Sequence, residues 1–177
     1  DLSRWGSWRN VSVIASNAHS GQRSLLADTG NGNAWTRRTL GAAPSTTTTT
    51  VWLRVPSSSL ATAFTVVKLR TAADQAIAGV GISALRKLQL RNDVTATTTT
   101  GSAPALTLDA WHRIDFTATT AGTASTTLVR QDGGTVGVIS ATDVNLGSTP
   151  VGMVQLGELN TAKTFTAQWD DVSVTSP

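Results

Sequence analysis

The sequence predicts an all-β fold, built as an antiparallel sandwich or barrel, and three observations support this. Thr, Ser, Val, Ala and Gly dominate the 177 residues, in short strand-like runs that recur between turn residues. No stretch of ten or more residues shows the 3.6-residue apolar period of an amphipathic helix. The connections are too short for crossover helices, so neighbouring strands should pair antiparallel.

We expect ten clear strands, separated by turn residues such as Asn92-Asp93 and the Asp-Gly-Gly segment at 132–134. About ten short strands with this spacing are typical of a sandwich or a barrel. In chain order, the expected strands cover residues 11–15, 47–55, 64–69, 76–83, 87–91, 111–119, 125–130, 135–140, 151–156 and 164–174.

Two threonine tracts, at 46–50 and 97–100, could be mistaken for linkers. The first runs directly into the apolar segment 51–55, and because Thr is β-branched and prefers extended structure, we expect it to begin a strand. The second is followed by Gly-Ser-Ala-Pro, which predicts a strand end or an exposed loop. Neither tract marks a domain boundary, so we expect one domain over residues 1–177.

Composition excludes several classes of function. The chain has no cysteine, which excludes disulfides, a thiolate nucleophile and a cysteine zinc site. Its 14 basic and 11 acidic residues give a net charge of +3, but the basic residues are spread thinly, which argues against a nucleic-acid partner. No apolar run approaches the roughly 20 residues that would insert into a membrane. We expect a soluble, mature or excised piece of a larger multidomain chain.

Four segments in order carry a resemblance to a known family: Leu2-Ser-Arg-Trp5, His19-Ser-Gly-Gln-Arg-Ser-Leu25, Trp111-His-Arg-Ile-Asp-Phe116 and Trp169-Asp-Asp-Val-Ser-Val174. Together they resemble concanavalin A-like or laminin G-like jelly rolls, a group that includes many carbohydrate-binding modules of bacterial extracellular proteins. The resemblance implies a two-sheet antiparallel jelly-roll β-sandwich and a secreted or cell-surface location. It also implies that Trp5, Trp111 and Trp169 pack in the core.

The same resemblance implies a structural calcium ion near the closing Asp-Asp-Val segment. The carboxylate would come from Asp170 or Asp171, and backbone oxygens between His19 and Arg23 would add to the shell. Calcium prefers six to eight oxygen ligands, and these modules complete the shell with an acidic residue just before the segment that matches Leu2. Two alternatives stay open: Asp170 caps backbone amides, or it pairs with Arg23.

Strand alternation suggests which carboxylate is buried. If Val172 and Val174 face the core, period two turns Asp170 inward and Asp171 outward. A buried carboxylate is costly unless a cation or several donors accompany it. The alternation therefore favours Asp170 as the residue that holds the ion or the amides.

Catalytic groups are scarce. Glycoside hydrolysis normally needs a pair of carboxylic acids, but Glu158 is the only glutamate, and no Glu-x-Asp-x-x-Glu strand or Gly-x-Ser-x-Gly motif is present. The chain also contains no Tyr, which the lyases of this fold would need. His112 is the one catalytic candidate, although a bond to a neighbouring strand explains it more simply. We expect no enzyme activity.

Sugar binding is the alternative use of exposed aromatic residues, because an indole face can stack on a sugar ring. In the segment 51–55 the aliphatic residues share one face, which leaves Trp52 and Arg54 on the other. The same alternation turns three more polar side chains outward: Gln89, Arg91 and Arg113. Trp35 follows a Gly- and Asn-rich loop and could reach a ligand at the rim of the sandwich.

We therefore expect a non-catalytic, lectin-like module whose partner is a polysaccharide or glycan. One version of this hypothesis has an acidic polysaccharide as the ligand. Trp52 or Trp35 would stack on a sugar, and the arginines and Gln89 would bond hydroxyls or carboxylates. One alternative is a structural or adhesive module without a glycan ligand, with an outer sheet rich in Thr and Ser. Another is a polysaccharide-active enzyme with an unfamiliar site around His112.

Overall fold

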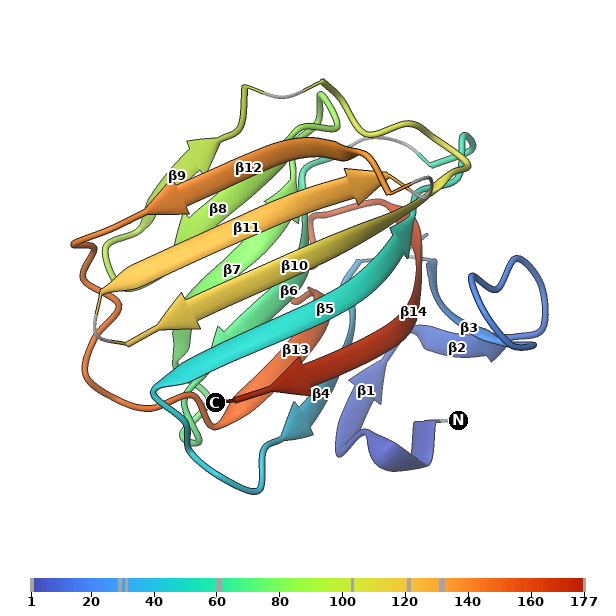
Figure 1. Ribbon diagram of the computed structural model, residues 1–177. Helices are drawn as coiled ribbons and strands as arrows, with labels where there is room; N and C mark the ends of the chain where they lie inside the picture. Colours follow the sequence, from blue (N-terminus) through green and yellow to red (C-terminus); the bar gives the residue numbers. More distant parts are fainter. Residues whose placement is uncertain are drawn as a thin grey trace.

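The computed structural model describes residues 2–28, 30, 32–59, 62–102, 104–120, 122–130 and 133–176, and for 127–130 the backbone alone. Within these residues, the chain forms two antiparallel sheets of seven strands each. The sheets pack face to face, as Figure 1 shows, and a short 3₁₀ helix η1 (Leu2–Arg4) precedes the first strand. No helix in the described part of the chain is long and apolar enough to cross a membrane.

Sheet A has the strand order β1-β4-β13-β6-β7-β8-β9, and sheet B has the order β12-β11-β10-β5-β14-β3-β2. The strands of sheet A are β1 (Ser7–Arg9), β4 (Ala34–Thr39), β13 (Met153–Glu158), β6 (Phe64–Arg70), β7 (Ala76–Ile82), β8 (Leu88–Asn92) and β9 (Thr97–Thr100). The strands of sheet B are β12 (Thr135–Ala141), β11 (Thr123–Arg130), β10 (Trp111–Thr119), β5 (Thr46–Arg54), β14 (Thr166–Thr175), β3 (Ser24–Asp28) and β2 (Val11–Ile14).

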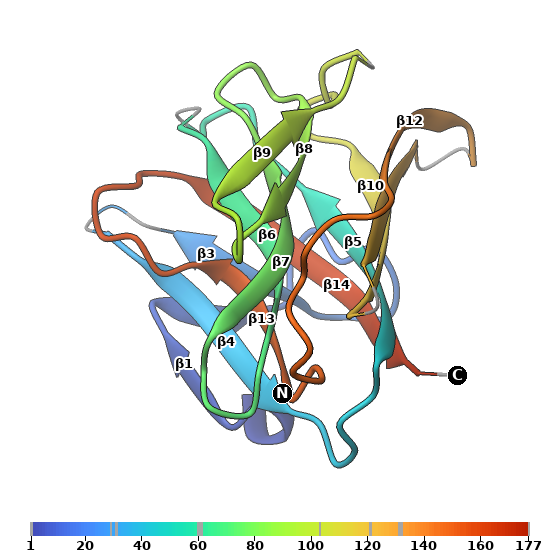
Figure 2. The same ribbon diagram turned by 90° about the vertical axis from the view of Figure 1, so that its left-hand side faces the viewer.

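The two layers are clearest edge-on in Figure 2, which also shows β4, β13, β6 and β7 running side by side in sheet A. Strands that are distant in sequence are neighbours in both sheets. In sheet A, β13 lies between β4 and β6, and in sheet B, β14 lies between β5 and β3. The two-sheet sandwich predicted from the sequence is therefore confirmed.

The core lies between the sheets and follows the predicted alternation. In β5, Val51 and Leu53 are fully buried, while Trp52 and Arg54 are partly exposed. The same pattern buries alternate apolar residues of β8 and β10: Leu88, Leu90, Ile114 and Phe116. Burying alternate residues on the inner face of each sheet removes apolar surface from water, which is the main stabilising contribution to such a sandwich.

All ten expected strands are present, and the structure adds four that the sequence pattern missed: β1, β3, β4 and β9. The second threonine tract was expected to be a strand end or a loop, and this was wrong, because Thr97–Thr100 is β9 itself. All four of its side chains are exposed, and it pairs only with β8 at the edge of sheet A. An edge strand without an apolar face shows no alternation in sequence.

The predicted inward orientation of Asp170 was also wrong. Trp169 is 1% exposed and lies opposite Leu53, so the next residue, Asp170, turns to the outer side opposite Trp52. The pairing with β5 is then interrupted by a bulge between Asp170 and Ser173, at which Asp171 has a φ of 45°. A bulge adds one residue and restarts the alternation, which is why counting back from Val172 failed.

Candidate functional site

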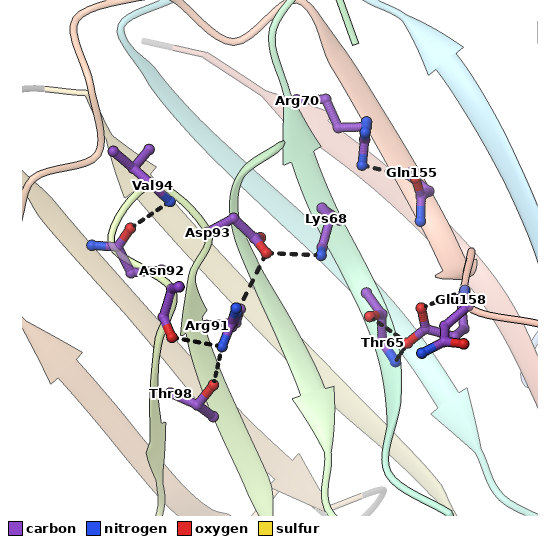
Figure 3. Close-up of polar contacts among 12 residues, drawn as sticks. Thr65, Lys68, Arg70, Arg91, Asn92, Asp93, Val94, Thr98, Gln155 and Glu158 are labelled. Carbon is purple, nitrogen blue, oxygen red and sulfur yellow. Dashed lines mark hydrogen bonds and ion pairs between the residues drawn. The ribbon is translucent and has the colours of Figure 1, made fainter. Parts of the chain in front are cut away.

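The outer face of sheet A carries a groove of about 440 Å³. The central strands β6, β7 and β8 form it, and residues of β9, β13 and the segment that follows β13 complete its sides. Figure 3 shows how the polar side chains of these strands gather on this one face. Pockets that bind small molecules have similar or larger volumes, so the groove is large enough for such a ligand.

Two glycines of β7, Gly79 and Gly81, leave part of the floor of the groove without side chains. Because every second residue of a strand faces the same side, both present bare backbone to the groove. Polar residues of the two neighbouring strands lie directly opposite these glycines: Lys68 and Arg91 for Gly79, and Thr65 and Gln89 for Gly81.

A charged cluster forms one wall of the groove. Lys68 Nζ lies 3.1 Å from Asp93 Oδ1, and Arg91 Nε lies 3.4 Å from the same oxygen. Arg91 Nη1 also donates to Thr98 Oγ1 at 3.0 Å, as Figure 3 shows, and to the Ala96 carbonyl at 2.9 Å. Asp93 Oδ2 is buried and has no hydrogen-bond partner in the described part of the chain. Two cations thus share one carboxylate oxygen, and 40% of the Arg91 side chain stays exposed to a ligand.

Glu158 closes the opposite end of the groove, but its carboxylate is fully engaged. Oε2 accepts the backbone N–H and the hydroxyl of Thr65 at 3.1 and 2.9 Å, and Oε1 accepts the Asn160 N–H at 2.9 Å. These bonds tie β13 to β6 and leave Glu158 in a structural role. The structure thus supplies no free acid at the position of the only glutamate.

A second polar cluster continues the same face beyond the groove. Gln155 pairs with Lys68 across the ladder, and its side-chain oxygen accepts Arg37 Nε at 3.2 Å and Arg70 Nη1 at 3.5 Å. Both arginines also bond Asp74, Arg37 at 2.9 Å. Gln155 is 1% exposed, so the side chains of this cluster cover the outer face of sheet A here. The open space on this face lies in the groove.

Comparison with known proteins identifies the architecture. No family model and no curated protein matches the sequence. Among solved structures, the cellulose induced protein Cip1 has a TM-score of 0.74 at 17% identity, covering 100% of this chain and 93% of that one. The chain is a jelly roll.

Two further jelly rolls match over most of their length. The carbohydrate-binding module CBM66 from Bacillus subtilis has a TM-score of 0.57 at 12% identity, covering 96% of this chain and 97% of that one. A family 7 alginate lyase, A1-II′, solved with a product bound, has a TM-score of 0.62 at 12% identity, covering 88% and 80%. At these identities the likeness establishes the fold.

The jelly roll separates the six residues predicted to bind sugar into two sets of three. Gln89 and Arg91 lie in the groove, and Trp35 lies in β4 on the same outer face of sheet A. The other three lie on the outer face of sheet B: Trp52, Arg54 and Arg113. Alternation along a strand predicts which side chains point outward, but it does not tell to which of the two outer faces they belong.

The three residues on sheet B have partners within the chain. Trp52 stacks on the His19 ring, with 3.6 Å between ring centroids and 15° between planes. Arg54 donates to Gln168 Oε1 at 2.9 Å and to Asp109 Oδ1 at 2.6 Å. Arg113 pairs with Asp115. The expected arrangement, with Trp52 beside both Arg54 and Arg91 in one groove, is therefore not what the structure has.

Trp35 follows the Gly- and Asn-rich loop, as noted from the sequence, and it is the second residue of β4. The guanidinium carbon of Arg37 lies 4.6 Å from the centre of its ring, so a cation covers one face of the indole. Its Nε1 is buried and has no acceptor in the described part of the chain. Trp35 therefore belongs to the face that carries the groove, without lining the groove itself.

The Asp170–Asp171 pair binds the loop that contains His19. Asp170 Oδ2 accepts the backbone N–H groups of His19 and Ser20 at 2.8 and 3.2 Å, and Oδ1 accepts the Asp171 N–H. Asp171 accepts His19 Nδ1 and the Ser20 hydroxyl, at 2.7 and 2.6 Å. Burial raises the pKa of Asp171, but the bonds from Ser20 and His19 outweigh it and hold the pKa below its ordinary value.

These contacts bear on the calcium hypothesis. N–H and O–H donors occupy carboxylate oxygens that a calcium ion would need, and no group of three or more His, Cys, Asp or Glu side chains in the described residues could hold a metal ion. The described residues thus do not fit a calcium shell as they stand. They do match one alternative left open by the sequence, in which Asp170 caps backbone amides. Calcium binding remains a prediction.

His112 does not lie in the groove. It is a residue of β10 in sheet B, 1% exposed, and its Nδ1 lies 3.2 Å from the Ala110 carbonyl oxygen. Most groove residues were not singled out from the sequence, and these include Lys68, Asp93 and the two glycines of β7. Only the strand order, in which β7 lies between β6 and β8, brings Lys68 near Arg91.

Proposed function

We propose that the chain is a non-catalytic carbohydrate-binding module that holds a polysaccharide in the groove of sheet A. The observation that carries this proposal is the bare backbone of Gly79 and Gly81 between polar walls. A sugar ring can lie against such a floor, while Gln89, Arg91 and Lys68 bond its hydroxyl or carboxylate groups. The groove lies on the outer face of sheet A, where a polymer can reach it from solvent.

The charge of the groove favours an acidic polysaccharide. Its lining includes three cations, Lys68, Arg91 and Lys163, and two anions, Asp93 and Glu158, which leaves an excess of one positive charge. A carboxylated or sulfated sugar would add the missing anion. Charge-assisted bonds from arginine and lysine to a carboxylate are stronger than bonds to a neutral hydroxyl.

The comparisons support the class of ligand without identifying it. CBM66 is a carbohydrate-binding module by name, and the alginate lyase was solved with a carbohydrate product. A secreted or cell-surface location, within a larger multidomain chain, is part of the same proposal. We assign no catalytic role, because Glu158 is bonded within the chain and His112 lies in the other sheet.

A structural or adhesive module is the second candidate, and the outer face of sheet B favours it. Threonine hydroxyls of β5 and β10 pair across the strands, Thr46 with Thr119 and Thr48 with Thr117, each at 2.9 Å. Such cross-strand threonine pairs stabilise a sheet and expose methyl and hydroxyl groups in a regular pattern. This candidate predicts that no glycan binds in the groove.

Two matched arginine variants test the proposal. Arg91 and Arg113 are similarly exposed, at 40% and 44%, and each bonds one nearby aspartate, but they lie on opposite outer faces. Affinity electrophoresis and calorimetry against neutral and acidic polysaccharides should show Arg91→Gln weakening the binding by about tenfold, the loss of one charged hydrogen bond. Arg113→Gln should bind like the parent protein.

The outcomes separate the candidates. If Arg113→Gln weakens glycan binding and Arg91→Gln does not, the binding site lies on sheet B. No binding to any neutral or acidic polysaccharide in the screen would favour the structural module. Binding of neutral glycans alone, weakened by Arg91→Gln, would keep the groove and remove the acidic ligand.

A further inference from the structure

A second and larger cleft, of about 640 Å³, opens between the two sheets. Its walls come from β4 and β13 of sheet A and from β14, β3 and β2 of sheet B, and η1 lies beside it. It shares no lining residue with the groove on the outer face of sheet A. A ligand bound here would therefore contact a different set of side chains.

Apolar side chains from both sheets line the interior of this cleft. Val154 and Leu156 of β13 are each 1% exposed, and they face the cleft together with Leu25 of β3 and with Val172 and Val174 of β14. The last three are only partly buried against the core. An apolar ligand would complete the burial of these side chains, which is the usual source of affinity in such sites.

Trp169 adds an unsatisfied donor to the same wall. It is 1% exposed and lines the cleft, and its Nε1 has no hydrogen-bond acceptor among the described residues. A buried donor without a partner costs free energy, so an oxygen brought in by a ligand would be favourable there. A ligand with both apolar and oxygen-bearing parts therefore suits this wall.

Three arginines surround the cleft on its solvent side. Arg4, Arg23 and Arg38 are exposed, come from three different segments, and make no ion pair or hydrogen bond through their side chains in the described part of the chain. Two carboxylates, Asp170 and Asp171, also line the cleft, but His19 and Ser20 occupy their oxygens. The lining thus carries an excess of one positive charge, and its guanidinium groups are available to an anion.

We propose that this cleft binds an amphipathic carboxylate, with a hydrocarbon chain between the sheets and a carboxylate head on Arg23 and Arg38. These two arginines come from opposite sides of the cleft, so one head group can contact both sheets. Carboxylate and guanidinium groups match in geometry as well as in charge. A cleft of this volume, enclosed by two sheets, suits one single-chain molecule in solution and does not suit a bilayer surface.

The test uses decanoate and dodecanoate with the full chain, at a pH well above the carboxyl pKa, in calorimetry. Each added methylene group should tighten binding by about fourfold, because it buries more apolar surface. Decanol, which is neutral, and decyltrimethylammonium, which is cationic, should bind more weakly than decanoate. The intrinsic tryptophan fluorescence should change as well, because Trp5 and Trp169 line the cleft.

The double variant Arg23→Gln with Arg38→Gln should weaken dodecanoate binding by at least about threefold. Neither side chain has a partner in the described residues, so its thermal unfolding should match that of the parent protein. Arg113→Gln, on the outer face of sheet B, is the control and should bind dodecanoate normally. Arg91→Gln should also bind it normally, because the groove takes no part.

Three results would overturn the proposal. They are no measurable binding of either carboxylate, binding of decyltrimethylammonium as tight as that of decanoate, or a loss of dodecanoate affinity in the double variant of less than about threefold. The polysaccharide proposal is unaffected by any of them, since it depends on other residues. Conversely, a failure to bind glycans would not affect the cleft proposal, which is tested by the carboxylate titrations alone.

Discussion

Asp109 shows how one carboxylate can connect a strand to two loops. Its Oδ1 accepts Arg54 Nη2 at 2.6 Å, and its Oδ2 accepts the Ser57 N–H at 3.2 Å. The bonds from Ser57, together with the charge of Arg54, hold the pKa of Asp109 below its ordinary value. Because the ionised form is the one that accepts these bonds, the folded state favours it.

This pKa shift predicts a pH-dependent effect of Asp109→Asn. A carboxylate with a lowered folded pKa contributes stability above its unfolded pKa of 3.8, and this contribution is lost as pH falls through the folded pKa. Urea unfolding should therefore show a lower midpoint for the variant at about pH 7, and a difference that shrinks below about pH 3. Asp143→Asn is the control, because Asp143 is exposed, also has a positive φ, and its carboxylate has no hydrogen-bond partner among the described residues. An unchanged difference at low pH would contradict this explanation.

Asp171 marks the limit of what could be predicted residue by residue. The family resemblance implied that Trp169 is buried, and this is confirmed. It also implied that the Asp-Asp segment and the His19 loop share a calcium shell, whereas the structure shows direct hydrogen bonds between them. The bulge at Asp171 has no signal in the local sequence, because an aspartate with a positive φ leaves no trace in a pattern of alternating residues. The orientation of Asp170 therefore had to come from the structure.

At the scale of one element, β7 is unusual in using glycine on its outer side. A Cβ added at Gly79 would lie 2.8 Å from the Val67 carbonyl oxygen, and one added at Gly81 would lie 2.8 Å from that of Phe64. Both distances are too short for a carbon atom, so β6 and β7 could not keep this spacing with any other residue. The floor of the groove is thus bare because the two backbones are too close for a side chain.

Gly81→Ala should therefore destabilise the protein by about 1–3 kcal/mol, as expected when extra volume forces the backbone to shift. Gly41→Ala is the matched control, because a Cβ there meets nothing within 4 Å, and we expect it to change stability by less than about 0.5 kcal/mol. Both values can be measured by urea unfolding. Equal effects of the two substitutions would show that close backbone contact is not the reason for the glycine.

The sequence pattern predicted the strands that have one apolar face, and it missed strands that lack one. The buried strands β5 and β10 were predicted within one residue of their ends. The missed strands β1 and β9 have only exposed residues, so no alternation of apolar and polar residues marks them. β4 was hidden for a different reason, because its outward positions include Trp35 and its inward ones include the polar Thr36.

At the scale of the whole molecule, the two sheets meet through aromatic rings. Phe64 of sheet A stacks on Phe165 at 4.4 Å between centroids, and Phe165 meets the edge of Trp169 of sheet B at 6.5 Å. Such contacts add to the free energy gained by burial of the rings. The sequence predicted a core position for Trp169, but the partners of its ring depend on the packing of the two sheets.

Trp169→Ala should accordingly lower the free energy of unfolding by about 3–5 kcal/mol, the cost of removing a large buried ring. Trp8→Ala, at a site that is 48% exposed, should change it by less than about 0.5 kcal/mol. Thermal and urea unfolding of both variants provide the measurement. A small effect at Trp169 would mean that the ring does not join the sheets as the structure indicates.

The strand order also explains why the binding residues were only half predicted. Gln89 and Arg91 were expected at a binding surface and lie in the groove, but Trp52, Arg54 and Arg113 are outward residues of the other sheet. Lys68 of β6 lies near Gln89 and Arg91 of β8 only because these two strands flank β7. Relations between strands distant in sequence cannot be read from alternation within each strand.

The last two strands of the chain are interior strands, one in each sheet, and this has a consequence during synthesis. Until β13 and β14 leave the ribosome, β4 has no link to β6, and β3 has none to β5. The nascent chain must therefore wait with two incomplete sheets and exposed edges, a state prone to aggregation. Any chaperone that assists this protein would be needed most in the interval before the final strands arrive.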